Sequence, residues 1–414
     1  MAKLNEWASY KVKHPYIYFI IFIFSCLGLF VINTVQGVFF KRMADDFPTA
    51  PYFVLVFCSA SFVIVFFVMM VIRYILNLLY CKLRSVDFPK YNYVGHGWLM
   101  LIGLLDSLNG LILLFAAHKT PASLHPILPN ITIPFTFVMS YILIRQKFRL
   151  KHFFGDMVSS FIVLVGVLIS IIPVFIDIAH NPDSVKTSAI WPIIFILGIL
   201  PGALMNIVQE RASKDVEKLD YIHLNGWVSV YQLVCDFLFF WANFVFPTNI
   251  HNLGDLGSAF DKGFQCLGGI NVITNGTVIG NCHMAAIDTS VFVSGHVGTH
   301  LFSALLLRMS SSIFISLVNV FVSPMAEFIF FIVGMDKITW YVGAALPIMM
   351  IGIIFNTIVD YFKAKSDSQD EKRKEVEENE DEYPNYSPTI NSSNSSNLTE
   401  ADNLIDNIFY PTNL

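Results

Sequence analysis

Three acidic residues interrupt long apolar runs of this chain and are its first candidates for chemistry. Asp106 lies in the stretch "LLDSLNGL" with Asn109 about one helical turn further on, and Asp236 and Glu327 lie deep in two other apolar runs. A carboxyl group that is removed from water takes up a proton more readily than an exposed one, so each could bind a proton in an acidic compartment and release it in a neutral one. The alternative is that each carboxyl group only hydrogen-bonds a neighbouring helix.

The stretch "ASLHPILPNITIPFTF", residues 122–137, sets prolines and polar residues in a run of membrane-span length. Pro121 and Pro126 suit a helix start, whereas Pro129 and Pro134 would leave backbone carbonyls without partners inside a helix. Such carbonyls and the polar side chains near them could line a polar cavity. The neutral polar candidates are Ser123, Asn130 and Thr132 here, and Asn319 and Ser323 in a similar stretch. A kink that serves only packing is the alternative.

The histidines give weaker signals. His125 titrates at about pH 6.5 in water, so it would be charged in an acidic vacuole and neutral in the cytosol, although a structural hydrogen bond explains it equally well. His296 and His300 are spaced like metal ligands on one helix face, but no cysteine or carboxylate accompanies them, and we predict no metal. No catalytic or nucleotide-binding motif is present, so we predict neither an enzyme nor a cofactor.

The composition indicates a helical membrane protein. The chain is 55% hydrophobic and 14% charged, and its mean hydropathy of +0.60 is too high for a soluble domain. The long apolar runs predict an all-α fold of ten transmembrane helices. The eighth span is the weakest, and nine spans with a re-entrant piece are the alternative. The ten spans are about 16–38, 52–80, 97–117, 122–145, 153–175, 190–209, 225–246, 289–307, 311–334 and 339–362.

The distribution of lysine and arginine predicts the orientation. Most of them fall in the segments that share a side with the N-terminus, which places both termini in the cytosol. The long loop 247–288 then faces the lumen. There Cys266 and Cys282 could form one disulfide, and Asn275 begins a glycosylation sequon. The other sequons lie in a span or in the cytosolic tail, so we discount them.

Sequence echoes at an interval of five spans predict two inverted repeats. The stretch "SLVNVFVSPMAEFIFF", residues 316–331, repeats the order of asparagine, proline and aromatic residues found in span 4, and it lies in span 9. Because five is odd, two five-helix halves insert in opposite senses, the plan of many secondary transporters. We expect a first repeat at 16–175 and a second at 190–362.

The two ends lie outside these repeats. Residues 1–15 form a short cytosolic N-terminus, and residues 363–414 form an acidic tail that is low in apolar residues and predicted to be disordered. Near its end "EADNLI", with Glu400 before Leu404 and Ile405, matches the sorting signals that clathrin-adaptor proteins read in endosomal and lysosomal proteins.

These residues resemble the chloroquine-resistance-transporter-like family of the drug/metabolite transporter superfamily. The resemblance covers most of residues 16–362 and stops at the tail. It is carried by "LLDSLNGLILLFA" with Asp106, "ASLHPILPNITIPF" with Pro134, "PGALMNIVQE" with Asn206, "LDYIHLNGWVSVYQLV" with Gln232, and "GFQCLGG" followed by "GTVIGNC".

The resemblance implies ten spans in two inverted halves, a vacuolar or lysosome-like membrane, and proton-coupled export of nutrients or drugs. It implies that "NTVQG", with Asn33 and Gln36, lines the cavity without a charge that would repel cations. It lends some support to Asp106 but none to Asp236 or Glu327. Of the four loop cysteines of drug-transporting relatives, only Cys266 and Cys282 match, so one bridge at most remains.

We therefore expect a secondary transporter of a vacuolar or endolysosomal membrane. Its partners would be a small substrate, such as an amino acid, peptide or thiol peptide, together with protons and the lipid bilayer, and no nucleic acid. Such export would help to maintain the osmotic balance of a digestive vacuole. A Golgi nucleotide-sugar antiporter is one alternative, although these spans lack a lysine-rich cavity. A membrane scaffold without transport is the other.

Overall fold

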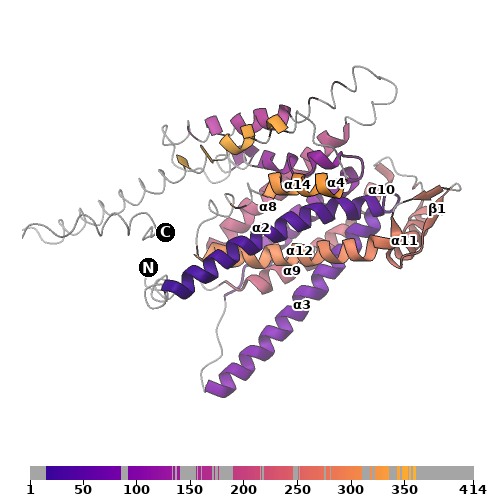
Figure 1. Cartoon of the computed structure of the whole chain (residues 1–414). Helices are drawn as coiled ribbons and strands as arrows, with labels where there is room; N and C mark the ends of the chain where they lie inside the picture. Colours follow the sequence, from indigo (N-terminus) through magenta and orange to yellow (C-terminus); the bar gives the residue numbers. More distant parts are fainter. Residues whose placement is uncertain are drawn as a thin grey trace, which may run out of the picture. The chain divides into compact units, whose positions relative to one another are not determined.

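The computed structural model of this chain is almost wholly helical (Figure 1). The described residues are 15–84, 92–132, 134–135, 138–139, 155, 157–159, 161–169, 172, 176, 190–214, 216, 219–245, 250, 252–274, 277–279, 281–309, 318, 322–334, 343–345, 347–352, 354–355 and 358–359. The chain divides into two units, Met1–Thr357 and Ile358–Leu414, and every element named below belongs to the first.

The long helices follow the apolar runs of the sequence. They are α2 (Pro15–Asp46), α3 (Pro51–Arg84), α4 (His96–Ala117), α8 (Ile190–Lys214), α9 (Tyr221–Leu238), α11 (Leu253–Leu267), α12 (Cys282–Met309) and α14 (Val322–Val333). After α9, the 3₁₀ turn η3 (Phe239–Trp241) and the short helix α10 (Ala242–Val245) continue the same run. Two further apolar helices span Met157–Ile169 and Gly343–Gly352.

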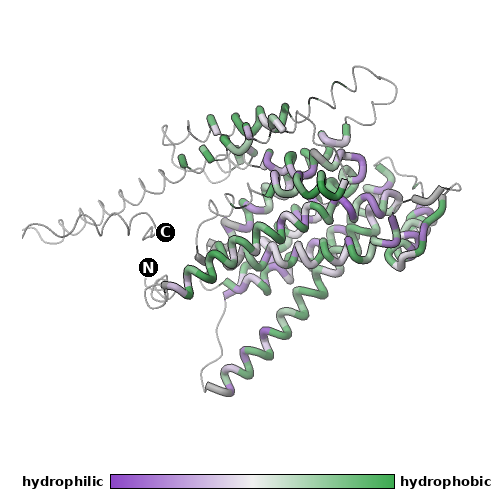
Figure 2. The backbone as a smooth tube through the Cα atoms, in the orientation of Figure 1, coloured by the Kyte–Doolittle hydropathy of each residue, from purple (hydrophilic) through white to green (hydrophobic). Residues whose placement is uncertain are grey.

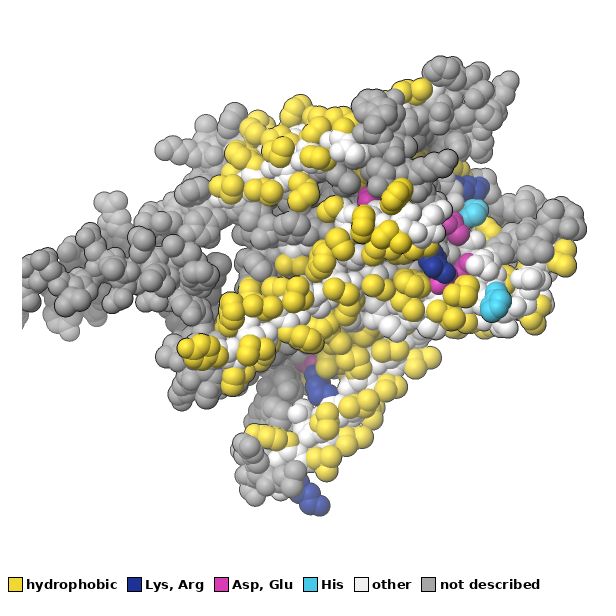
Figure 3. Space-filling model, viewed as in Figure 1, with side chains coloured by type: hydrophobic (Ala, Val, Ile, Leu, Met, Phe, Trp, Pro, Cys, Tyr) yellow, Lys and Arg dark blue, Asp and Glu magenta, His cyan; other side chains and the backbone are white. Residues whose placement is uncertain are grey.

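Five helices of the described part of the chain are long and apolar enough to cross a membrane. They are Tyr16–Asp46, Pro51–Lys82, His96–Ala117, Ile190–Gln209 and Tyr221–Val245. Hydrophobic residues make up most of these helices (Figure 2). Large apolar side chains are exposed on their surfaces, as at Phe24, Leu27 and Val71, which water would disfavour and lipid would accept. Figure 3 shows hydrophobic side chains over much of this face. The protein is therefore a multi-pass membrane protein.

The eighth predicted span forms one helix of 28 residues, α12, and not a re-entrant piece. At a rise of about 1.5 Å per residue it is about 42 Å long, which exceeds the apolar core of a bilayer. Its composition is more polar than that of the five helices above. That ten spans cross the membrane stays a prediction.

The fourth predicted span departs from the expected α-helix at its beginning. Residues 122–131 form two 3₁₀ turns, η1 (Ala122–Leu124) and η2 (Leu128–Ile131), before helical residues follow from Thr132. Pro126 and Pro129 have no backbone N–H to offer, so the i→i−4 bonds of an α-helix cannot form regularly here. Pro121 directly precedes η1, so the helix start predicted there takes the form of 3₁₀ turns.

The most extensive helix contacts pair α2 with α12, α4 with α8, and α3 with α9. Glycines permit the close approach of several helices. A Cβ atom on Gly103 of α4 would lie 2.9 Å from the backbone nitrogen of Gln232 in α9, and one on Gly202 of α8 would lie 2.9 Å from Asn109 Oδ1 in α4. Small residues therefore set the helix spacing where polar side chains meet.

The loop between α10 and α12 forms a small ordered layer. Asn252 and Asp255 form a capping box at the start of α11, in which each side chain accepts the backbone N–H of the other. The hairpin of β1 (Val272–Thr274) and β2 (Thr277–Ile279) is antiparallel, with Val272 paired with Ile279. The aromatic rings of Phe260 and Phe264 pack on Phe53 of α3 and attach the layer to the bundle.

Candidate functional site

The two interrupted stretches predicted in spans 4 and 9 touch each other. Asn130 Nδ2 lies 3.0 Å from Ser323 Oγ of α14, and the Ser323 hydroxyl donates to the Pro126 carbonyl at 2.8 Å. Asn130 also donates to the Ile127 carbonyl at 3.0 Å. The Pro126 carbonyl, to which Pro129 has no N–H to donate, is thus satisfied by Ser323 and Asn130, both of which were predicted site residues.

Other predicted residues surround this contact. Glu327 lies one turn beyond Ser323 on α14 and is buried, with 4% of its surface exposed. Thr132 donates to the Pro129 carbonyl at 2.8 Å, and Pro134 is half-buried in a helical segment. Asn130 and Thr132 therefore lie at the end of η2, and Ser323 and Glu327 lie on the neighbouring helix α14.

A second polar cluster joins α2 to α12. Gln36 Nε2 lies 3.1 Å from His296 Nδ1, and Thr299 Oγ1 approaches both Asn33 Oδ1 and Gln36 Oε1, the latter at 2.8 Å. His296 Nε2 lies 3.1 Å from His300 Nε2. Asn33 and Gln36 were predicted to line a cavity. Their contacts with Thr299 and His296 were not predicted.

A third cluster surrounds Asp236 of α9. Its side chain is fully buried, and its two carboxylate oxygens accept hydrogen bonds from Ser59 of α3 and Ser107 of α4. Asp106 lies half-buried in α4, close enough to Asp236 for their charges to interact. Two hydroxyl donors stabilise a buried carboxylate, so Asp236 has the surroundings of a structural group that links three helices.

Charged residues gather where α2 ends and α12 begins. Lys41 donates to Asp45 at 2.8 Å and to the carbonyls of Ala117 and His118 that end α4. A cation at the last carbonyls of a helix is favourable because they carry the negative end of its dipole. Arg42 pairs with Asp288 of α12 at 3.0 Å. Figure 3 shows basic, acidic and histidine side chains at this end.

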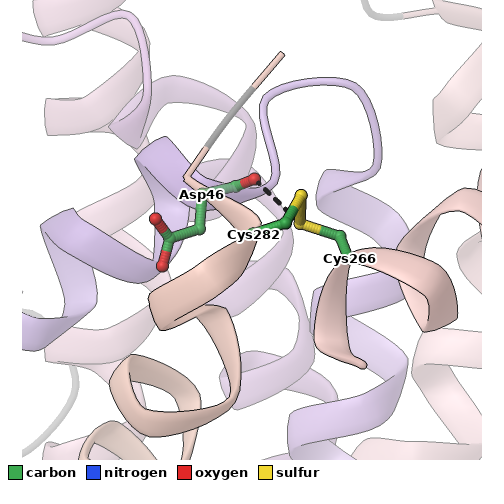
Figure 4. The surroundings of a disulfide bond; sticks show 3 residues. All are labelled: Asp46, Cys266 and Cys282. Atoms are coloured by element: carbon green, nitrogen blue, oxygen red, sulfur yellow. Dashed lines mark hydrogen bonds between the residues drawn. A yellow bond between two sulfur atoms is a disulfide. The ribbon is translucent and has the colours of Figure 1, made fainter. Parts of the chain in front are cut away.

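A disulfide lies beside this charged region. Cys266 of α11 and Cys282 of α12 are bonded, and the Asp46 carbonyl lies 3.5 Å from Cys266 Sγ (Figure 4). The bond links the α11 layer to the first residue of α12. Nearby, Lys119 follows α4 with its ammonium 4.2 Å from the centre of the Trp191 ring, and burial lowers the pKa of this lysine.

An ion pair that the sequence did not reveal joins the C-terminal half of α3 to the start of α9. Arg73 of α3 bonds both carboxylate oxygens of Asp220, which caps the start of α9 through the backbone N–H groups of Ile222 and His223. The bidentate geometry and the buried carboxylate make this a strong positional contact. The predicted span began at residue 225, so the sequence did not mark Asp220 as the cap of this helix.

The remaining predicted residues have varied surroundings. His125 is buried, and its Nε2 lies 3.0 Å from the Ala117 carbonyl, which fits the structural alternative. Gln232 is buried on α9, and Asn206 is exposed on α8. The side chains of Ser123 and Asn319 lie outside the described residues, as do Asn275, Glu400, Leu404 and Ile405.

Comparisons with known proteins show which family this sequence resembles. The profile of the family described as CRT-like, chloroquine-resistance transporter-like, matches residues 16–359. Crt homolog 3 of Dictyostelium discoideum is 25% identical over 333 residues, which is 74% of this chain and 66% of that protein.

Two relatives carry the name chloroquine resistance transporter. The Toxoplasma gondii protein is 26% identical over 61% of this chain and 26% of its own length, and the Plasmodium vivax protein is 21% identical over 44% and 40%. The chain therefore spans less than two thirds of the length of these relatives. The match over residues 16–359 nevertheless covers most of this chain, and the family that it describes is transporter-like. The chain belongs to the chloroquine-resistance-transporter-like family.

Proposed function

We propose that this protein is a proton-coupled secondary transporter of a vacuolar or endolysosomal membrane. It exports small cationic or zwitterionic nutrients, such as amino acids or short peptides, to the cytosol by alternating access. Family membership supports transport as the class of activity. The direction, the proton coupling and the compartment rest on the predicted orientation, in which both termini are cytosolic, and on the resemblance.

The pattern of helix contacts is the observation that carries the proposal. If α2, α3, α4 and the η1–η2 stretch are spans 1 to 4, then α8, α9, α12 and α14 are spans 6 to 9. In two equivalent halves, span 1 corresponds to span 6, and span 3 corresponds to span 8. The contact of span 1 with span 8 therefore corresponds to the contact of span 6 with span 3. Both are among the most extensive contacts in the described part of the chain, as α2 with α12 and α4 with α8.

Other contacts obey the same correspondence. The contact of α14 with α2 corresponds to that of η2 with α8, and the contact of α4 with α9 corresponds to that of α12 with α3. The contacts of α3 with α9 and of α14 with η1 map onto themselves. The weak contact of α2 with α4 has no counterpart of similar extent. This pattern supports two equivalent halves, which is the construction that alternating access requires.

The Asn130–Ser323 contact lies on the axis of this correspondence because it joins span 4 to span 9. Its members are uncharged and hydrogen-bonded, so the contact can separate and be replaced by substrate or water without leaving a buried charge. A substrate with amine and carboxyl groups would find carbonyl acceptors on the η1–η2 side and hydroxyl and amide donors from Ser323 and Asn130. The geometry suits a small polar cargo.

Transport by purified protein tests the proposal. The protein is reconstituted in liposomes, and uptake of radiolabelled amino acids and short peptides is measured with and without a pH gradient, with nucleotide sugars as the competing substrates. We expect uptake of at least one amino acid or peptide, accelerated by the gradient. Uptake restricted to nucleotide sugars would favour the Golgi antiporter, and no uptake of any compound would favour the scaffold.

A further inference from the structure

The α2–α12 interface brings a glutamine onto a histidine pair within the bundle. A Cβ atom on Gly295 would lie 3.1 Å from Gln36 Cβ, and one on Gly298 would lie 2.9 Å from Ile32 Cδ1. The two helices therefore meet at van der Waals distance, and the Gln36 side chain lies directly on α12 beside His296. His296 is 14 residues from Cys282, about 21 Å along a helix of 28 residues, which is the middle of α12.

The hydrogen bonds fix which nitrogen of each ring carries a proton. The Gln36 amide nitrogen can only donate, so His296 Nδ1, 3.1 Å away, must accept. A neutral His296 then carries its proton on Nε2 and donates it to His300 Nε2 at 3.1 Å. His300 in turn carries its own proton on Nδ1. The neutral pair thus has one consistent arrangement of its hydrogens.

The same network has a second arrangement that accommodates one more proton. A proton on His296 Nδ1 would face the donor of Gln36, and rotation of the Gln36 carboxamide by half a turn removes the conflict. Gln36 Oε1 then accepts from His296, and Gln36 Nε2 donates to Thr299 Oγ1. In the first arrangement the Thr299 hydroxyl can donate to either Gln36 Oε1 or Asn33 Oδ1. In the second arrangement it donates to Asn33 alone.

The surroundings of the pair are aromatic. Phe62 of α3 stacks on the His296 ring with centroids 4.2 Å apart, and Phe66 meets the His300 ring edge-on at 6.2 Å. An aromatic ring attracts a cation positioned over its face, so Phe62 can stabilise a protonated His296.

The elements that pack around the pair carry several charged groups. On α2, Lys41 pairs with Asp45, and Asp46 is buried at the end of the helix. Arg42 of α2 pairs with Asp288 of α12, and Arg73 of α3 pairs with Asp220 before α9. Asp236 of α9 accepts from serines, Glu327 is buried on α14, and α11 carries Asp255, Asp261 and Lys262. Among the described residues, none of these groups is hydrogen-bonded to or paired with either ring. Proton uptake by the pair would therefore change the charge inside the bundle by one unit.

We propose that the His296–His300 pair is the binding site for the coupled proton, and that rotation of the Gln36 carboxamide signals its occupancy to Asn33. The inference rests on the proposed proton-coupled transport and deepens it. Asp236 is a weaker choice because both of its oxygens already accept hydrogen bonds that hold three helices together. His296 has an unprotonated nitrogen whose partner can reverse its role.

The experiment compares pH-gradient-driven uptake in liposomes by the wild type, His296→Gln and His283→Gln. His283 is a matched control because it lies exposed at the start of the same helix. We expect the acceleration by the gradient to fall at least tenfold in His296→Gln, whose uptake should be nearly independent of pH. The His283→Gln variant should keep the wild-type pH profile.

The outcomes separate this inference from the function on which it rests. If the wild type transports nothing, the proposed function fails. If the wild type and His296→Gln respond to the gradient alike, transport stands and the histidine site is overturned. Should His296→Gln not fold, Gln36→Met removes the rotating carboxamide without touching a histidine, and it should shift the pH profile. A wild-type profile in a folded Gln36→Met protein would overturn the inference.

Discussion

The substitution Gly103→Ala tests how glycine sets the contact between α4 and α9. The new methyl group would lie 2.9 Å from both the Gln232 backbone nitrogen and the Val228 carbonyl oxygen, and 2.7 Å from Tyr231 Cβ. Backbone atoms within a helix cannot turn aside, so α4 and α9 must move apart. Insertion of a methyl group into a packed interior costs about 1–3 kcal/mol, and the better helix propensity of alanine offsets about 1 kcal/mol.

The net loss is therefore up to about 2 kcal/mol, which corresponds to a fall in Tm of a few degrees at roughly 2 °C per kcal/mol for a large domain. The displacement would also separate Ser107 of α4 from Asp236 of α9, which adds to the loss of stability. The free cysteines Cys58 and Cys235 are buried, so a thiol-reactive dye that labels them on unfolding reports the Tm of the purified protein.

Gly97→Ala is the matched control on the same helix. Nothing lies within 4 Å of the position its methyl group would take, so this variant should be at least as stable as the wild type. If Gly103→Ala retains the Tm and uptake of Gly97→Ala, the close α4–α9 contact does not exist in the folded protein and the reasoning is refuted.

Three further predictions concern single contacts. Ser107→Ala removes one of two donors to the buried Asp236 carboxylate and should lower the free energy of unfolding by about 1.5–3 kcal/mol, measured by thermal unfolding. Ser61→Ala is the control, because it loses only a bond to the Phe57 carbonyl of its own helix and should lose less stability. Equal losses in the two variants would contradict this prediction. Arg73→Leu leaves Asp220 buried without its cation and should lower the free energy of unfolding by about 3–5 kcal/mol. Arg211→Leu, at an exposed position, is the control. An Arg73→Leu protein with the same Tm as the control would contradict this prediction. Replacing both Cys266 and Cys282 by serine removes a bridge between residues 16 positions apart and should lower the free energy of unfolding by about 3 kcal/mol through loop entropy. Protease should then cleave within residues 252–281, as it should after reduction of the wild type. Unchanged protease resistance would show that the bridge does not hold this layer.

Apolar run length predicted most of the helices because a bilayer-spanning helix must be long and apolar whatever packs against it. The predicted starts at 52, 97 and 190 lie within one residue of the observed helices, whereas α2 extends to Asp46 and α12 begins at Cys282, beyond the apolar runs. Those extensions carry Arg42 and Asp288, whose mutual pairing makes charged helix ends favourable. Hydropathy alone cannot detect such a pair.

The candidate site was predicted in part. The proline and asparagine pattern identified Asn130 and Ser323, because broken backbone hydrogen bonds require polar partners wherever they occur. The partners of Gln36 were missed because they depend on which helix Gly295 and Gly298 allow to approach α2, and helix periodicity does not specify a neighbour. The serine donors to Asp236 were missed for the same reason. Interhelical hydrogen bonds follow from packing that a single sequence does not display.

Cross-linking of spans 4 and 9 tests the central claim of two halves that move against each other. Asn130→Cys and Ser323→Cys are combined in a protein without its four free cysteines, and substrate uptake is measured before and after a short bifunctional thiol reagent that reduction can remove. Because Asn130 and Ser323 are in hydrogen-bond contact, we expect efficient cross-linking, loss of uptake and its recovery after reduction. Full uptake by the cross-linked protein would contradict it.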